Sequence, residues 1–246
     1  MGDLEQLQER LGYQFKSRRL LLEALSHPSY IAEHPTAGLD NQRLEFYGDA
    51  VIQLIVTRRL FEQFPDRPEG ELTKMRAILT RQSSLAALAR NIDLGPNLRM
   101  GKGEIMTDGQ TRPSNLCDAF EALMAAIYLD VGETLSTTNT IVNRLIDEHF
   151  PEIERLLEDD NPKGLLQERL QSECGQKPNY ELVEVTGPDH QRTFRVVVKC
   201  GDQELAEGSG SKRQKAEQNA ARNALRQFSI SRKDSKPEDP GSDPTD

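Results

Sequence analysis

The sequence predicts two folded parts, an all-α domain followed by a small α+β domain with the order α-β-β-β-α. Apolar residues recur with a helical period over most of the first 150 residues. Beyond residue 160, three short segments have the composition and alternation of strands and lie between two helical segments. The chain has 246 residues, a length that suits two domains better than one.

The helical segments of the first part are long, and Pro or Gly separates several of them. No stretch of comparable length alternates with a period of two, so we predict an all-helical domain over residues 1–150. In order, the predicted helices cover residues 4–11, 18–25, 41–64, 71–92, 114–129 and 136–150.

The pattern changes near residue 160. Residues 151–160 form an acidic linker, and Asn161-Pro162 is typical of a helix N-cap followed by Pro at the first helical position. We predict a second domain over 161–229, with helices at 163–173 and 214–228 and strands at 180–185, 193–200 and 203–207. The tail, residues 230–246, is rich in Pro, Asp and Ser and is predicted to be disordered.

Composition excludes several classes of protein. Mean hydropathy is −0.65, and no apolar run approaches the length of a membrane span. The N-terminus is too polar and too acidic for a secretory signal. The three cysteines, Cys117, Cys174 and Cys200, are widely spaced and contain no CxxC pair, so neither a disulfide framework nor a zinc site is indicated. We expect a cytoplasmic protein that does not associate with membranes.

Charge is divided unevenly along the chain. Residues 1–160 hold 17 basic and 26 acidic residues, whereas residues 161–228 hold 11 basic and 9 acidic ones. The net charge of −9 for the whole chain therefore conceals a mildly basic second part. Such a part is compatible with a polyanionic partner, which the overall charge alone would argue against.

The predicted helix NQRLEFYGDAVIQLI, residues 41–55, carries two carboxylates one turn apart, Glu45 and Asp49. Like charges at this spacing repel. The face that they share continues into Ile52 and Val56, which a solvated face would not do. Surface charges on an amphipathic helix remain the simpler alternative, but buried carboxylates need a cation or a proton, and a bound cation is favoured.

A second acidic pair, Asp118 and Glu121, lies on the otherwise apolar helix PSNLCDAFEALMAAIYLD. Small residues beside it, and Gly48 on the first helix, allow two helices to approach closely. Two such helices can bring four carboxylates to one point. Oxygen ligands of this kind are those that a hard cation such as Mg²⁺ prefers.

The segment NQRLEFYGDAVIQL is similar to the signature helix of the ribonuclease III family, whose usual form is NERLEFLGDAVL. Further similar segments are LSHPSY at 25–30, FPDRPEGELTKMRA at 64–77, GKGE at 101–104 and RPSNLCDAFEALMAAIYLD at 112–130. The C-terminal part resembles a double-stranded RNA-binding domain. Together the resemblances cover roughly residues 4–228.

The resemblance implies an endoribonuclease that hydrolyses double-stranded RNA as a homodimer, with Mg²⁺ as cofactor and Mn²⁺ able to substitute. The products would carry 5′-phosphates and short 3′ overhangs, and precursors of ribosomal RNA and structured RNAs would be the substrates. The family's metal-binding acids correspond to Glu45, Asp49, Asp118 and Glu121, of which Asp49 and Glu121 carry the catalytic role. Glu69 matches a further acidic position, although a solvated loop acid is an equal alternative.

One residue departs from the family pattern. Gln42 stands where the family usually has Glu, so the outer acidic group lacks one charge. We expect altered RNA positioning or metal dependence rather than loss of activity.

Three regions of the second domain resemble the family's RNA-contacting regions. The first helix and the GPxH-like loop would enter successive minor grooves, where 2′-hydroxyls are exposed. The start of the last helix would bind phosphates. The predicted RNA-binding residues are Lys163, Gln167, Glu168, Gly187, Pro188, His190, Ser211, Lys212, Arg213 and Lys215.

The main alternative is a non-catalytic, dimeric protein that binds double-stranded RNA. Loss of a metal-binding acid would favour it, and none of the four is lost. A metal-dependent phosphohydrolase of small molecules is disfavoured by the RNA-binding module.

Overall fold

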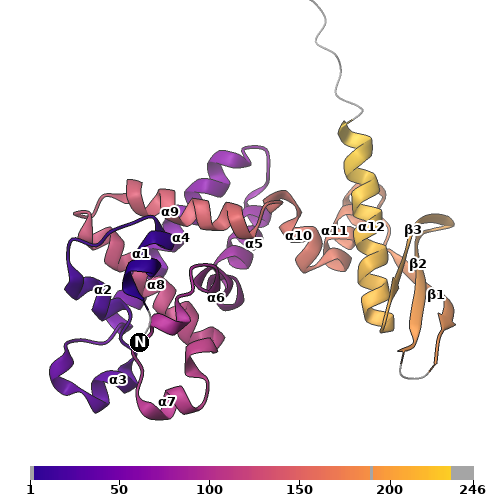
Figure 1. The fold of residues 1–246 in the computed structure, drawn as a ribbon. Coiled ribbons are helices and arrows are strands. Elements are labelled where there is room, and N and C mark those ends of the chain that lie inside the picture. The colour runs from indigo at the N-terminus through magenta and orange to yellow at the C-terminus, as the bar shows by residue number, and fades with distance from the viewer. Residues whose placement is uncertain (1–2, 189–190, 234–246) are drawn as a thin grey trace, which may run out of the picture. The chain divides into compact units, whose positions relative to one another are not determined.

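Helices form nearly all the regular structure before residue 154 in the computed structural model, which describes residues 3–188 and 191–233. The side chains of residues 154, 159 and 228–233 lie outside the description. The main helices of this part are α1 (Leu4–Leu11), α2 (Arg18–Ala24), α3 (Pro28–Glu33), α4 (Gln42–Gln63), α5 (Glu69–Thr80), α6 (Gln82–Asn91), α7 (Lys102–Met106), α8 (Pro113–Asp130) and α9 (Leu135–His149) (Figure 1).

The second part contains a three-stranded sheet between helices. Its elements are α10 (Leu156–Asp160), α11 (Pro162–Cys174), β1 (Asn179–Thr186), β2 (Thr193–Cys200), β3 (Gln203–Gly210) and α12 (Arg213–Lys233). The predicted fold class, an all-α domain followed by an α-β-β-β-α domain, is therefore confirmed.

The segment predicted as one helix over 71–92 is two helices, and this is a correction. Arg81 has an extended backbone (φ −66°, ψ 152°) and separates α5 from α6. The Ser84 hydroxyl donates a hydrogen bond of 2.6 Å to the Ile78 carbonyl, which closes the bend. Apolar periodicity continues through the bend, because both helices bury residues against the same core, so periodicity alone could not locate it.

The core of the first part is built around α8, which is buried along most of its length. Helix α4 packs along it, and Gly48 marks the closest approach. A Cβ atom at Gly48 would lie 1.9 Å from the Glu121 carbonyl oxygen, so only glycine fits. The close approach that the small residues predicted is confirmed at this position.

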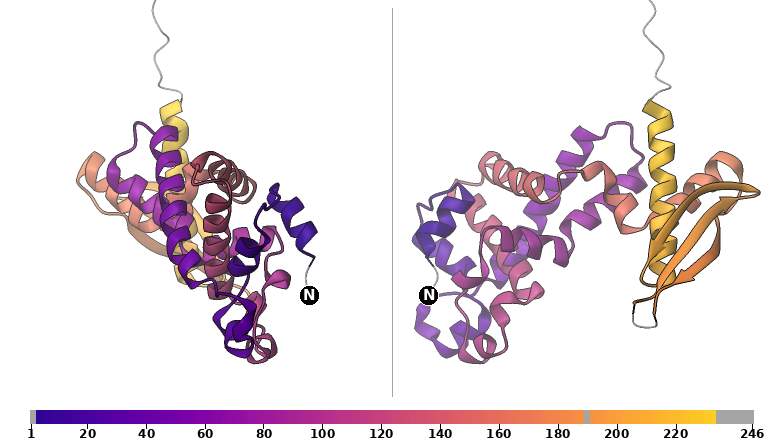
Figure 2. Two further views of the ribbon diagram at one scale, coloured as in Figure 1. Left: turned by 90° about the vertical axis from the view of Figure 1, so that its left-hand side faces the viewer. Right: turned by 45° about the vertical axis from the view of Figure 1, so that its right-hand side comes forward.

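The sheet of the second part has the order β1-β2-β3, with both pairs antiparallel. Helix α12 packs against one face of it, as Figure 2 shows. Four alanines of α12, Ala216, Ala220, Ala221 and Ala224, are all buried. The last three of these alanines pack with Leu166 and Leu170 of α11 and with Val198 of β2. Phe228, the last residue of the helix predicted over 214–228, has its side chain outside the description.

The chain divides into two units between Ile153 and Glu154. Helix α12 runs to Lys233, past the predicted domain end at residue 229, because no Pro or Gly interrupts the segment before Pro237. The rest of the predicted tail, 234–246, lies outside the described residues. Within those residues, no helix combines the length and the hydropathy needed to cross a membrane.

Candidate metal centre and nucleic-acid interface

Helices α4 and α8 place two acidic segments directly against each other. Gly48, which lies between Glu45 and Asp49 in the sequence, touches the backbone of Glu121. Glu45 is partly buried, whereas Asp49 is exposed. The tight helix contact therefore sets both carboxylates of α4 beside the acidic segment of α8.

On α8, Asp118 and Glu121 lie on one face and are both partly buried. Together with Cys117 they form a group whose ligand atoms all lie within 4.8 Å of one another. The Cys117 thiol donates to Glu121 Oε1 at 3.6 Å. Cys117 is buried, as expected for a small core residue, and burial raises the pKa of its thiol well above the usual range.

Electrostatics connect the two acidic pairs through Glu121 and Glu45. Burial is the main cause that raises the pKa of Glu121 to about 7, and the negative charges of Asp49, Asp118 and Glu45 contribute to the rise. Burial also raises the pKa of Glu45, followed by the charge of Asp118. The structure thus brings the two sequence-predicted pairs together into one cluster of negative charge.

This cluster has the properties of a cation site. Within residues 3–188 and 191–233, none of the four carboxylates forms an ion pair with Lys or Arg. Partly buried anions that repel one another are stabilised by a cation or by protonation. An all-carboxylate donor set fits a hard divalent ion such as Mg²⁺ or Mn²⁺, with water completing the shell.

The structure adds one acid that the sequence interpretation missed. Asp40 lies just before α4, and its Oδ1 accepts a hydrogen bond of 3.1 Å from the backbone N–H of Gln42. Its charge is also among the causes that raise the pKa of Glu45. Gln42 itself is exposed on the first turn of α4. Asp40 thus supplies negative charge in the neighbourhood where Gln42 lacks it.

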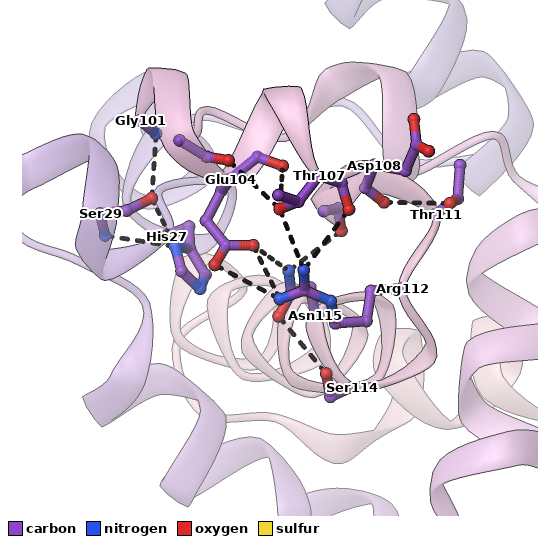
Figure 3. Close-up of polar contacts among 12 residues, drawn as sticks. His27, Ser29, Gly101, Glu104, Thr107, Asp108, Thr111, Arg112, Ser114 and Asn115 are labelled. Carbon is purple, nitrogen blue, oxygen red and sulfur yellow. Dashed lines mark hydrogen bonds and ion pairs between the residues drawn. The ribbon is translucent and has the colours of Figure 1, made fainter.

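A polar network fixes the segment that leads into α8 (Figure 3). The Glu104 carboxylate accepts hydrogen bonds from Arg112 Nη1 at 2.9 Å and from Asn115 Nδ2 at 3.3 Å. Asn115 Nδ2 also donates to the Gly109 carbonyl at 3.0 Å. Because Arg112 occupies the N-cap position of α8 and Asn115 lies in its first turn, these contacts hold the N-terminus of the helix that carries Asp118.

His27 belongs to a neighbouring set of contacts, also drawn in Figure 3. Its Nδ1 accepts a hydrogen bond of 3.2 Å from the Ser29 N–H and so caps α3. The Ser29 hydroxyl in turn accepts from the Gly101 N–H at 2.9 Å. Burial raises the pKa of Asp118, and the charge of His27 acts in the opposite direction.

Glu69 does not join the four acids. It is the first residue of α5 and is exposed, and its Oε1 accepts a hydrogen bond of 2.7 Å from the Thr73 hydroxyl. The charge of Glu69 is not among the causes that shift the pKa values of Glu45, Asp118 or Glu121. Instead, Glu69 lines a hollow between the end of α4 and the start of α5.

In the second unit, Lys163 is held by contacts within the protein. Its Nζ donates to Glu217 Oε2 at 2.6 Å and lies 4.4 Å from the centre of the Tyr180 ring. The hydrogen bond from Lys163 is the main cause that lowers the pKa of Glu217. Glu217 also accepts from Arg213 Nε at 3.0 Å. Lys163, a predicted RNA-binding cation, therefore also joins α11 to α12, whereas Arg213 pairs with Glu217 within α12.

Further predicted RNA-binding residues within the described part of the chain are exposed. On α11, Gln167 and Glu168 are exposed, as are Ser211, Lys212 and Lys215 at the start of α12. Within the described residues, neither Lys212 nor Lys215 takes part in an ion pair.

The loop between β1 and β2 is described only in part. Gly187 has a positive φ of 87°, and a Cβ atom there would lie 2.5 Å from the Gln191 carbonyl oxygen, so the turn requires glycine. The Pro188 carbonyl accepts a hydrogen bond of 2.8 Å from the Gln191 N–H. His190 lies outside the described residues.

Comparison with known proteins gives consistent matches over both units. Residues 17–148 match a family described as ribonuclease-III-like, and residues 162–228 match the double-stranded RNA binding motif. A protein named ribonuclease 3 from Dehalococcoides mccartyi is 40% identical over 93% of this chain and 96% of its own length. A second ribonuclease 3, from Desulforamulus reducens, is 44% identical over 89% of each chain.

A solved structure matches the first unit. It is the nuclease domain of ribonuclease III from Campylobacter jejuni, described with flexibility in a region involved in dimer formation. The match has a TM-score of 0.56 and 40% sequence identity, and it covers 61% of this chain and 99% of the other.

Proposed function

Because the chain belongs to the ribonuclease III family and is a ribonuclease, we propose that it cleaves double-stranded RNA by metal-dependent hydrolysis of phosphodiester bonds. The observation that carries this proposal is the cluster of four carboxylates on α4 and α8. Among the described residues, no Lys or Arg forms an ion pair with any of them. The family resemblance adds products with 5′-phosphates and short 3′ overhangs.

In this proposal, Glu45, Asp49, Asp118 and Glu121 hold Mg²⁺, and Mn²⁺ can take its place. When bound, the metal supplies a nucleophilic water and stabilises negative charge on the phosphate. The packing of α4 on α8 holds the four carboxylates in place before substrate arrives, so little reorganisation is needed. Burial and the charges of the other three acids together raise the pKa of Glu121, and it is the residue that we expect to be indispensable.

The second unit supplies the affinity for duplex RNA. We propose that Lys212, Lys215 and the backbone N–H groups at the start of α12 contact phosphates. Exposed polar residues of α11 and the loop between β1 and β2 would read the minor groove through 2′-hydroxyls. Lys163 and Arg213 contribute cationic charge to the same region while they bind Glu217. Ribosomal RNA precursors and structured messages, in the cytoplasm, are the substrates that the family suggests.

We further propose that the enzyme acts as a homodimer through α4. The side of α4 away from the core exposes large apolar residues, with Phe46 82%, Leu54 56% and Phe61 71% exposed. Apolar side chains so accessible on one helix are typical of a surface that a partner covers. The related nuclease domain, which is described in terms of dimer formation, supports a second copy of this chain as that partner.

Replacing Phe46→Lys should convert the protein from dimer to monomer, because a charge at a contact between two copies would be buried without a partner. Light scattering coupled to size-exclusion chromatography measures the change at micromolar concentration. Met106→Lys is the matched control, since Met106 is 85% exposed on α7 and its change should leave the dimer intact. A dimeric Phe46→Lys protein would exclude this face.

The direct test of the activity uses a long duplex RNA and its separated strands. With Mg²⁺, the duplex should be cut to short products with 5′-phosphates, whereas EDTA should stop cleavage and the single strands should react far more slowly. The same assay separates the enzyme from the alternative of a non-catalytic RNA-binding protein. Tight duplex binding without cleavage in Mg²⁺ and in Mn²⁺ would establish that alternative.

A further inference from the structure

Two cysteines in the second unit lie close together and play no part in the proposed reaction. Cys174 ends α11 and Cys200 ends β2, and their Sγ atoms are 3.4 Å apart. Cys174 is exposed and Cys200 is partly exposed, so small reagents can reach the pair. This proximity could not be predicted, because the two residues are widely separated in the chain and form no CxxC motif.

The surroundings of the pair allow its two sulfur atoms to approach further. A disulfide bond is about 2.05 Å long, so the sulfur atoms need to close only the remaining gap. Each cysteine is followed by a glycine with a positive φ, Gly175 at 69° and Gly201 at 59°. Both cysteines therefore stand where a regular element ends and a turn begins, and backbone adjustment there costs less than inside a helix or strand.

Hydrogen bonds distinguish the two thiols from each other. The Cys174 thiol lies 3.1 Å from the Leu170 carbonyl, and the Cys200 thiol donates to Gln176 Oε1 at 3.2 Å. The contact with Cys174 is the main cause that raises the pKa of Cys200. The thiolate is the nucleophile, and a raised pKa makes the thiolate of Cys200 scarcer. The more exposed Cys174 is therefore the thiol that reacts first.

We propose that Cys174 and Cys200 form a reversible disulfide that ties α11 to the sheet of the RNA-binding unit when a low-molecular-weight disulfide oxidant is present. The Cys174 thiolate attacks one sulfur of glutathione disulfide, whose S–S bond breaks and releases one glutathione thiolate. The Cys200 thiolate then attacks Cys174 Sγ and displaces the second glutathione. Both protein thiols lose their protons, the protein is oxidised by two electrons, and one glutathione disulfide becomes two glutathione thiols.

The cross-link would stabilise the unit against unfolding. It closes a loop that contains β1 and β2 and so restricts the unfolded chain. It also joins two elements that already share one apolar core, Leu166 and Leu170 of α11 with Val198 of β2. The proposed RNA-contacting residues on α11, Gln167 and Glu168, precede Cys174 by more than one turn and remain accessible.

Mass spectrometry of the full-length protein tests the proposal. Reduced protein is incubated with glutathione disulfide, free thiols are alkylated, and peptides are mapped without reduction. The expected product is one intramolecular cross-link between Cys174 and Cys200, which dithiothreitol removes. The oxidised protein should also unfold at a midpoint higher by about 5 °C or more for the transition of the second unit.

Two cysteine variants test which thiols form the cross-link. Cys117→Ser should cross-link like the natural protein, because Cys117 is buried on α8. Cys200→Ser should instead keep glutathione on Cys174, because the attacking second thiol is missing. A stable glutathione adduct on Cys174 in the natural protein, cross-links only between chains, or an unchanged unfolding midpoint in the cross-linked protein would each overturn the proposal.

Discussion

Cleavage of duplex RNA should fall by about 1,000-fold or more when Glu121 is replaced by Gln, while the affinity for the duplex stays within about threefold. Glu121 is the partly buried carboxylate that feels the charge of the other three acids. Removing one anionic ligand weakens metal binding, and the metal is expected to contribute several kcal/mol to stabilisation of the transition state. A loss of about 4 kcal/mol corresponds to the stated change in rate.

The measurement compares single-turnover cleavage and duplex binding for the same preparation. Binding is measured in Ca²⁺ or EDTA so that cleavage does not interfere. Glu62→Gln is the matched control, because Glu62 lies on α4, is exposed, and forms an ion pair with Arg58 one turn earlier. That variant should cleave at the natural rate. Equal losses of cleavage and binding in the Glu121→Gln protein would show that the two units do not divide these roles.

The second large effect is expected from Gly48→Ala. Its Cβ atom would lie 1.9 Å from the Glu121 carbonyl oxygen and 2.4 Å from the carbonyl carbon, so α4 and α8 must move apart. Overpacking of this kind costs about 1–3 kcal/mol or more. The gain in helix propensity from glycine to alanine, about 1 kcal/mol, offsets only part of it. We expect a lower free energy of unfolding for the first unit and a cleavage rate that falls with it, because the two acidic segments separate.

Chemical denaturation followed by circular dichroism measures the change in stability. Gly70→Ala provides the matched control, since Gly70 lies in α5 and nothing stands within 4 Å of an added Cβ atom. That substitution should be neutral or stabilising. If Gly48→Ala were as stable and as active as the control, the close contact between α4 and α8 would not be what aligns the carboxylates.

Local signals were sufficient to predict most of the elements. Helix α1 and strand β2 have the predicted bounds, because an Asp3 N-cap and a positive-φ Gly12 delimit the first and alternating residues mark the second. The break at Arg81 escaped prediction since the residues on both sides serve one core. Helices α3 and α7 are short, with 6 and 5 residues, and periodicity over so few residues carries little information.

The candidate site was predictable to the extent that each acidic pair lies on one helix. The spacing of Glu45 and Asp49, and of Asp118 and Glu121, is visible in the sequence, and Gly48 pointed to a close helix contact. The contacts around Glu104 were not predictable, because they join a short helix to the start of α8 through a turn. The ion pair between Lys163 and Glu217 was not predictable either, because its partners lie on α11 and α12, which the three strands separate in the sequence.

Metal binding to the RNA-free protein tests the central claim most directly. Titration of metal-free protein with Mn²⁺, followed by electron paramagnetic resonance, should show saturable binding that weakens by about tenfold or more in Glu45→Gln, Asp49→Asn, Asp118→Asn and Glu121→Gln, and not in Glu62→Gln. Affinity that is the same in all five variants as in the natural protein would contradict a shared divalent ion held by α4 and α8.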